Sequence, residues 1–177
     1  MKLDAKSTIE TGKAILGIEL GSTRIKAVLI DQENKPIAQG SHTWENQLVN
    51  GLWTYSIDAI WSGLQDCYAD LRSNVKKLYD TEIETLAAIG VSAMMHGYMP
   101  FNILDNEAHV KDIKFLTTLA GYVHWQITGE KVLGIGDASG MLPIDPTTNN
   151  YSAEMVAKFN NLIASKEYSW KLEDILP

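Results

Sequence analysis

The sequence predicts an α/β fold, with a mixed sheet that starts with a β-hairpin and is flanked by helices. Two apolar runs, residues 14–20 and 25–31, lie near the start of the chain and are separated by four small or polar residues. This pattern is typical of two buried strands joined by a tight turn. Apolar residues then recur at steps of three and four between residues 57 and 78, which is the period of an amphipathic helix.

Two further strands are expected around this helix. A turn signal at residues 34–36 leads to a third, less buried strand over residues 36–44. Ser56 precedes the apolar periodicity and is expected to cap the helix. After an acidic break, the apolar run over residues 86–94 predicts another buried strand.

The last third of the chain predicts two helices with an irregular segment between them. The first helix is expected over residues 107–127, where the pair Thr128-Gly129 would stop it. Residues 131–145 are rich in glycine and predict a strand or hairpin with an irregular middle. A helix over residues 152–164 is expected to turn five apolar side chains inward: Met155, Val156, Phe159, Leu162 and Ile163.

Composition excludes several classes of protein. The 177 residues carry 15 basic and 22 acidic side chains, a formal net charge of -7, with no basic block of the kind that binds nucleic acid. Cys67 is the single cysteine, which excludes an internal disulfide or a cysteine-based zinc site. No run of 18 apolar residues predicts a membrane span. We therefore expect a cytoplasmic protein without nucleic-acid or membrane partners.

The turn between the first two strands carries the sharpest chemical pattern. A turn of small residues directs backbone N–H groups outward, the hydroxyls of Ser22 and Thr23 add donors, and Arg24 or Lys26 can add positive charge. Together these groups suit a phosphate tail. Glu19, at the end of the first strand, could hold a magnesium ion directly or through water. An ordinary hairpin with a solvated tip explains the same residues when they are considered in isolation.

Three stretches, in order along the chain, resemble the FGGY carbohydrate kinases, which have the ribonuclease H-like fold of actin, Hsp70 and hexokinase. ILGIELGSTRIKAVLID resembles their first phosphate motif, and IGVSAMMHGYMPFN resembles the strand and loop that reach the sugar in xylulokinases. ITGEKVLGIGDASGMLPID resembles a TGE, DASG and Asp segment further along the same domain. The resemblance spans residues 14–177 as an FGGY N-terminal lobe and leaves residues 1–13 as an N-terminal extension.

The resemblance implies an ATP-dependent sugar kinase that uses Mg2+. The family's phosphate-binding positions fall on Gly21, Ser22, Thr23 and Lys26. Its acidic, magnesium-associated position falls on Glu19, where aspartate is commoner in the family.

The resemblance also implies a small-molecule sugar substrate, most similar to a ketopentose such as xylulose. The xylulokinase Met-His-Gly that contacts the sugar falls on Met95, His96 and Gly97. Asp137 matches the polar segment near the sugar cleft. Fold membership does not by itself fix a substrate.

Parts of the family pattern are missing from these residues. A sugar-binding loop is shortened to residues 98–107, and the resemblance places the general-base aspartate and the second lobe beyond Pro177. We therefore expect a partial first lobe that lacks useful kinase turnover alone. The alternative is a non-catalytic sugar- or phosphate-binding remnant or interaction domain, whose exposed apolar face would favour a homo-oligomer.

Three tryptophans, Trp44, Trp53 and Trp61, crowd the region before and into the first long helix. Given the acidic charge of the chain, side-chain packing explains them better than stacking on nucleic-acid bases. No G-x-x-x-x-G-K-[ST] motif is present, which excludes a P-loop nucleotide site.

Overall fold

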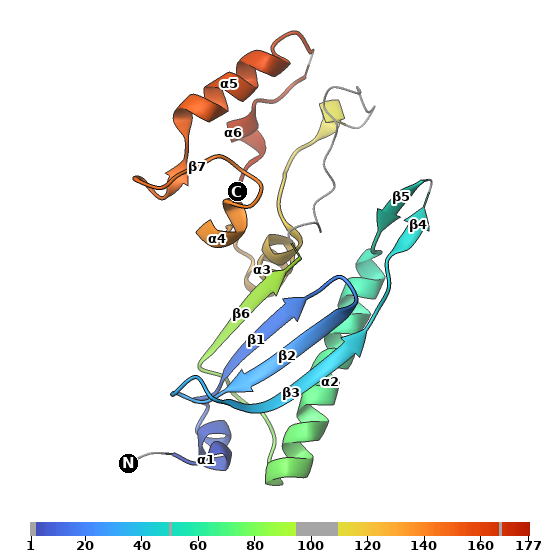
Figure 1. Ribbon diagram of the computed structural model, residues 1–177, viewed down its shortest axis with the longest axis vertical. Coiled ribbons are helices and arrows are strands. Elements are labelled where there is room, and N and C mark those ends of the chain that lie inside the picture. The colour runs from blue at the N-terminus through green and yellow to red at the C-terminus, as the bar shows by residue number, and fades with distance from the viewer. Residues whose placement is uncertain (1–2, 50, 95–109, 167) are drawn as a thin grey trace. The chain divides into compact units, whose positions relative to one another are not determined.

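The computed structural model describes residues 3–49, 51–94, 110–166 and 168–177 (Figure 1). The chain forms two compact units, Met1–Met94 and Met95–Pro177. Each unit is described below by itself. None of the described helices is both long enough and apolar enough to cross a membrane.

A four-stranded mixed sheet forms the centre of the first unit, in the order β3-β2-β1-β6 (Figure 1). Strands β1 (Ile15–Leu20) and β2 (Arg24–Ile30) form the predicted antiparallel hairpin. Strand β3 (Pro36–Thr43) continues the antiparallel order beyond β2. Strand β6 (Ala88–Ala93) pairs with β1 in parallel. The predicted α/β fold with a mixed sheet is therefore confirmed.

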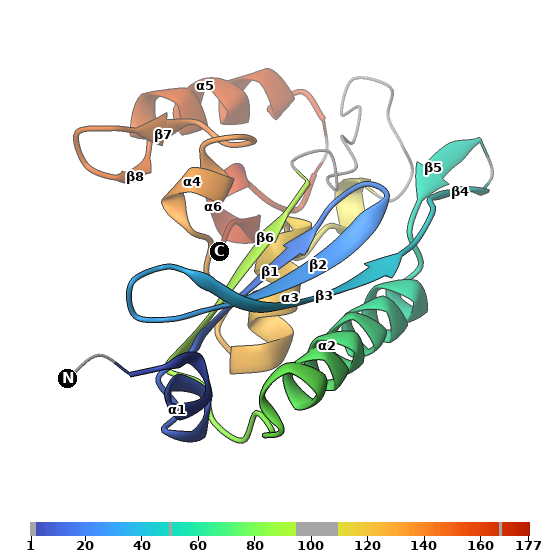
Figure 2. The ribbon, with the colours of Figure 1, turned by 60° about the horizontal axis from the view of Figure 1, so that its bottom comes forward.

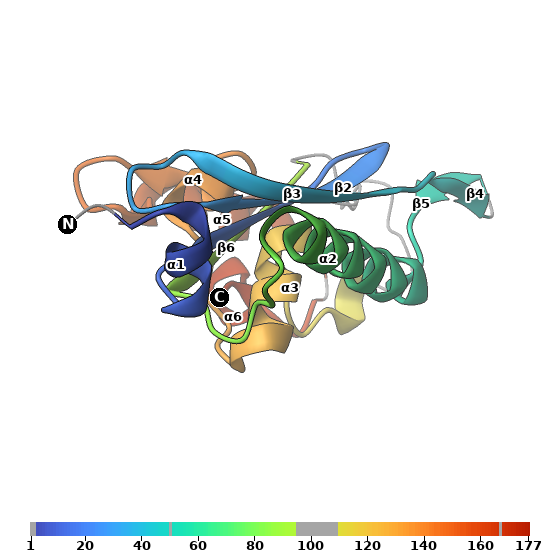
Figure 3. The ribbon, with the colours of Figure 1, turned by 90° about the horizontal axis from the view of Figure 1, so that it is seen from below.

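The core of this unit lies between one face of the sheet and helix α2 (Ile57–Tyr79), as Figure 3 shows. Buried and exposed residues alternate along the hairpin, because successive side chains in a strand point to opposite faces. The prediction of two buried strands is therefore wrong for one face of the hairpin. Residues buried on α2 are spaced by three and four, as predicted from the sequence. Ser56 caps α2 as expected, since its hydroxyl accepts a hydrogen bond from the Ala59 amide at 3.0 Å.

Helix α2 approaches β3 closely at Gly40. A Cβ atom at this position would overlap the backbone of Cys67 and Leu71, which lie on the facing turn of α2. Glycine is the residue that permits this approach, because any side chain would push the helix away from the strand. The close approach explains why α2 packs mainly on β3 and β2.

Polar side chains of α2 reach across to the outer edge of β3. Asp70 accepts a hydrogen bond from the Ser41 amide at 2.9 Å, and Asn74 donates to the Gln39 carbonyl at 2.9 Å. The Tyr79 hydroxyl donates to the carbonyl of Ile37 at 2.6 Å. Backbone groups on an edge strand otherwise remain open to another chain. Helix α2 therefore closes the β3 edge of the sheet.

Three short elements of this unit go beyond the predicted pattern. Helix α1 (Ala5–Glu10) forms within the predicted extension, begins at an Asp4 cap and buries Ile9. Strands β4 (Gln47–Val49) and β5 (Leu52–Thr54) form a small hairpin between β3 and α2 (Figure 2).

Strand β6 differs from the prediction in its exposure. Its span agrees with the predicted strand, but its side chains are exposed or half-buried, and Ile89 is 49% exposed. The prediction of a buried strand is wrong, since β6 is the outer strand of the described sheet and α2 packs on β3 and β2 at the other side of that sheet.

The second unit is mainly helical. It contains a short 3-10 helix η2 (Val110–Asp112), helices α3 (Leu119–Thr128), α4 (Ile135–Ala138), α5 (Ala153–Ile163) and α6 (Leu172–Ile175), and a small hairpin of β7 (Ile144–Asp145) and β8 (Asn150–Tyr151). Its apolar cluster joins residues far apart in the sequence: Val110, Ile163, Trp170, Leu172 and Ile175.

The helix predicted over residues 107–127 is wrong at its start. Helix α3 begins only after Thr118, whose hydroxyl accepts a hydrogen bond from the Gly121 amide at 2.9 Å and caps the helix there. Residues 107–109 lie outside the described residues. The predicted stop is confirmed, since Gly129 adopts a left-handed conformation and its amide donates to Trp125.

The other two predictions for this unit are confirmed in part. A strand or hairpin was expected over residues 131–145. The structure has the short helix α4 in the middle of this segment and strand β7 at its end. Helix α5 agrees with the helix predicted over residues 152–164 and begins after a Ser152 cap. Ile163 is buried, but Met155 and Leu162 are 47% and 61% exposed. Their predicted inward direction is wrong.

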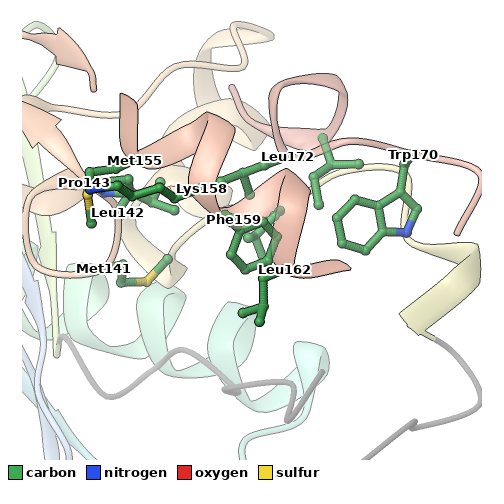
Figure 4. Close-up of a pocket in the computed structure, with 11 residues that line it drawn as sticks. Met141, Leu142, Pro143, Met155, Lys158, Phe159, Leu162, Trp170 and Leu172 are labelled. Carbon is green, nitrogen blue, oxygen red and sulfur yellow. The ribbon is translucent and has the colours of Figure 1, made fainter. Parts of the chain in front are cut away.

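An apolar pocket of about 400 Å³ accounts for these two exposed side chains. Met155 and Leu162 line it from α5, together with Met141, Phe159 and Trp170 (Figure 4). The apolar periodicity of α5 therefore marks a wall of the pocket as well as the packed core.

Replacing Gly40 tests the close approach of α2 to β3. We expect Gly40→Ala to lower the free energy of unfolding by about 1–3 kcal/mol, since the new methyl group meets helix backbone that cannot rotate away. Urea unfolding measures the change. Gly90→Ala is the matched control, because a Cβ there has nothing within 4 Å. Equal stabilities for the two variants would contradict the close approach.

The thiol of Cys67 offers a second test of this core. Its side chain is 1% exposed, and burial, with a smaller effect of the Asp70 charge, raises the pKa of the thiol to about 11. The thiol therefore stays protonated at pH 8, and we expect the native protein to resist a disulfide reagent that labels the unfolded chain fully. Stability should fall as pH rises from about 9 to 11, because the unfolded chain loses the proton first. Rapid native labelling at pH 8 would contradict this burial.

Candidate functional site

The candidate site lies at one end of the β1–β2 hairpin, on the polar face of the sheet. Glu19 and Lys26 are directly opposite each other in the antiparallel register, and both are exposed. The same row continues to Ser41 on β3 and Ser92 on β6. Opposed residues share a face of the sheet. The register therefore aligns a carboxylate, an ammonium group and two hydroxyls across all four strands.

The turn that joins the two strands is tight. The Gly21 amide donates to the Arg24 carbonyl at 3.0 Å, and a Cβ at Gly21 would lie 2.9 Å from the same oxygen. Glycine is therefore required at this point of the turn. Ser22 and Thr23 form the tip, and both are exposed.

Two aromatic residues hold the carbonyl groups of this turn. The Trp44 indole N–H donates to the Gly21 carbonyl at 2.7 Å, and the Trp44 amide donates to the Thr23 carbonyl at 3.2 Å. The Tyr55 hydroxyl donates to the Ser22 carbonyl at 2.5 Å. Within the described parts of the chain, the amides of Ser22 and Thr23 have no hydrogen-bond acceptor. The turn thus presents donors while its acceptors are engaged.

Trp44 and Tyr55 also support each other. Their ring centroids are 4.3 Å apart at an interplanar angle of 32°, and Trp44 is 6% exposed. Burial raises the pKa of the Tyr55 phenol, so its hydroxyl stays protonated and donates at neutral pH.

Sequence reasoning missed the role of these two aromatic residues. It assigned Trp44 to packing and gave Tyr55 no role. No local sequence pattern could have revealed these contacts. Trp44 lies 23 positions from Gly21, whose carbonyl it binds, and Tyr55 lies 33 positions from Ser22.

Strand β6 ends at the same edge of the sheet. The Met94 amide donates to the Leu20 carbonyl at 2.9 Å, immediately before the turn. Carboxyl ends of parallel strands meet at one edge of a sheet. The predicted sugar-binding residues Met95, His96 and Gly97 follow directly in the sequence but lie outside the described residues.

Asp137 belongs to the second unit. It is half-buried on α4 and accepts a hydrogen bond from the hydroxyl of Thr118, the residue that caps α3. This contact ties the start of α3 to α4 and gives Asp137 a structural partner. The structure brings Glu19, Lys26 and the turn together in one hairpin and leaves Asp137 in the separate unit.

Glu19 is the residue that could contribute to a metal site here. Among the described residues, no three His, Cys, Asp or Glu side chains gather into a cluster that could hold a metal ion. Magnesium is commonly held by one or two carboxylates together with substrate phosphates and water. A single exposed carboxylate beside a turn of outward donors fits such a shared ion.

Comparisons with known proteins agree with this geometry. The model of the FGGY family of carbohydrate kinases, N-terminal domain, matches residues 14–107, just over half of the chain. This match includes the hairpin, its turn and strand β6. None of the curated proteins matches the sequence at a significant level.

Solved sugar kinases share the fold. A xylulose kinase and a gluconate kinase, both from Lactobacillus acidophilus, are each 17% identical, with a TM-score of 0.61 over 93% of this chain and 41% of theirs. A xylulose kinase from Bifidobacterium adolescentis is 13% identical, with a TM-score of 0.59 over 94% of this chain and 47% of its own. The chain thus spans less than half the length of these structures.

The fold is the ribonuclease H-like fold of these kinases. Its first hairpin, the tight turn and the parallel strand that ends beside it all fall within the residues that match the family. The chain belongs to the FGGY family of carbohydrate kinases and carries the N-terminal domain of that family.

Proposed function

We propose that this chain forms the phosphate-binding part, and one wall of the sugar site, of an ATP-dependent carbohydrate kinase. The observation that carries the proposal is the turn at residues 21–23, whose three carbonyls are engaged, while the Ser22 and Thr23 amides have no acceptor among the described residues and both residues are exposed. Such a set of donors suits the oxygen atoms of a phosphate tail. The family match supports the same assignment.

Positive charge strengthens the proposed phosphate site. Lys26 lies on β2 three residues beyond the turn and directly opposite Glu19. We assign its ammonium group to a phosphate oxygen, because hydrogen bonds between charged groups are about twice as strong as neutral ones. Gly21 keeps the backbone close enough for the turn amides to share the same anion.

We assign Glu19 to the magnesium ion that accompanies ATP. The ion neutralises charge on the phosphate oxygens when it is bound. Glu19 contributes a carboxylate oxygen, directly or through water, from the strand that leads into the turn, and the hydroxyl-bearing Ser22 and Thr23 of the turn are exposed like Glu19 itself. Its side chain is one methylene longer than the commoner aspartate and therefore reaches further from the strand.

The sugar is proposed to be a ketopentose such as xylulose. The Met-His-Gly sequence at residues 95–97 supports this class, and Asp137 is proposed as a second contact. Phosphoryl transfer also requires a group that accepts the hydroxyl proton. We assign that role to no residue of this chain.

The assignment of Lys26 is tested by nucleotide binding. We expect Lys26→Ala to weaken binding of magnesium ATP by about tenfold or more, the usual loss for one charged hydrogen bond. Isothermal titration calorimetry measures the dissociation constant. Lys35→Ala is the control, since this exposed lysine lies in the opposite turn and pairs with Glu33 at 3.0 Å. Equal affinities for the two variants would refute the Lys26 assignment, and no binding by the unmodified chain would refute the phosphate site.

The sugar class is tested by binding of unlabelled sugars. We expect xylulose to give saturation-transfer NMR signals with this protein and gluconate, the substrate that names one structural neighbour, to give none. Ribulose and glycerol complete the panel. His96→Ala should abolish the xylulose signal, because the assigned contact is lost. A signal from gluconate that exceeds the xylulose signal would contradict the ketopentose assignment.

A further inference from the structure

We propose that Trp44 and Tyr55 are positioning residues that orient the phosphate-binding amides of Ser22 and Thr23. This inference rests on the proposed function and extends it to two residues outside the turn. We refer to Trp44 and Tyr55 together as the aromatic brace.

The geometry of the peptide bond links the brace to the amides. A trans peptide is planar, so the C=O of one residue and the N–H of the next point in opposite directions. The Trp44 indole holds the Gly21 carbonyl at 2.7 Å, which directs the Ser22 amide away from Trp44. The Tyr55 hydroxyl holds the Ser22 carbonyl at 2.5 Å, which directs the Thr23 amide away from Tyr55.

The brace also removes an electrostatic obstacle. Carbonyl oxygens carry partial negative charge and would repel a phosphate if the turn rotated them outward. All three carbonyls at residues 21–23 accept hydrogen bonds from the brace, including the Thr23 carbonyl from the Trp44 amide at 3.2 Å. Rotation of any of these peptides would break one of the hydrogen bonds. The outward face of the turn therefore remains a face of donors.

The brace is anchored in the most regular elements of the unit. Trp44 follows the last residue of β3, and Tyr55 directly precedes Ser56, the cap of α2. The two rings contact each other at a centroid distance of 4.3 Å. A donor held by packed elements lowers the entropy that the turn would lose on binding a ligand. The aromatic brace thus preorganises the turn before phosphate arrives.

The phenol hydroxyl of Tyr55 can be removed with little change in packing. Tyr55→Phe keeps the ring contact with Trp44 and deletes one hydrogen bond. Tyr79→Phe deletes a bond of the same kind, from a phenol to the Ile37 carbonyl at 2.6 Å, at the other end of α2. The two variants therefore match in chemistry and differ only in where the lost bond lies.

We expect Tyr55→Phe to weaken binding of magnesium ATP about fivefold and Tyr79→Phe to leave it unchanged. Both variants should lose similar stability in urea, since each loses one neutral hydrogen bond. Calorimetry gives the affinities, and protection of Cys67 from a thiol reagent confirms that each variant is folded. Equal ATP affinities for both variants, in a protein whose unmodified form binds ATP, would overturn the proposal.

A readout without ligand separates this inference from the proposed function. In nitrogen-15 NMR spectra of the free chain, Tyr55→Phe should shift the Thr23 amide signal and speed its hydrogen exchange, and Tyr79→Phe should not. Trp44→Phe, which lacks the indole donor, should affect the Ser22 amide in the same way. If the unmodified chain bound no ATP, the proposed function would fail. These amide signals would then still test whether Trp44 and Tyr55 orient the turn. Unchanged Ser22 and Thr23 amides would overturn it.

Discussion

The close approach of α2 to β3 at Gly40 is the contact on which the first unit depends. Helix backbone lies where a side chain would otherwise stand, so α2 comes within hydrogen-bonding reach of the strand edge. The same approach holds the middle of α2, at Cys67 and Leu71, against β3 near its end. Trp44 directly follows β3, and Tyr55 directly precedes the Ser56 cap of α2. The rings of these two residues contact each other beside the turn. The packing constraint at Gly40 therefore also affects the positions of the two aromatic residues that hold the proposed phosphate-binding turn.

One face of the β1–β2 hairpin packs into the core, and the opposite face carries the charged residues of the proposed site. Leu20 and Ile25 are opposed and fully buried, and the next pair along, Glu19 and Lys26, is opposed and exposed. A shift of one residue in register would exchange the two faces. The apolar pairs therefore stabilise the fold and also determine that the charged pair lies beside the turn. Substitution in the core of this hairpin would affect the site without touching it.

Local patterns in the sequence predicted much of the fold. Two apolar runs predicted the hairpin and three-to-four spacing predicted α2. Ser56 and Gly129 predicted helix ends, because a cap acts within one turn of helix. The start of α3 was missed because apolar spacing over residues 107–118 does not reveal competition from a cap at Thr118. The aromatic brace was missed because its hydrogen bonds join residues more than twenty positions apart.

Helix α2 blocks the β3 edge of the sheet, so the two edges of the sheet differ in how easily they could accept another strand. Another strand could join on that side only by displacing the α2 side chains that already pair with three backbone groups of β3. Growth of the sheet, whether by further segments of a longer polypeptide or by unwanted association during folding, is thereby disfavoured on one side. Substituting the polar residues of α2 by apolar ones would remove that asymmetry, although no residue of the strand itself had changed.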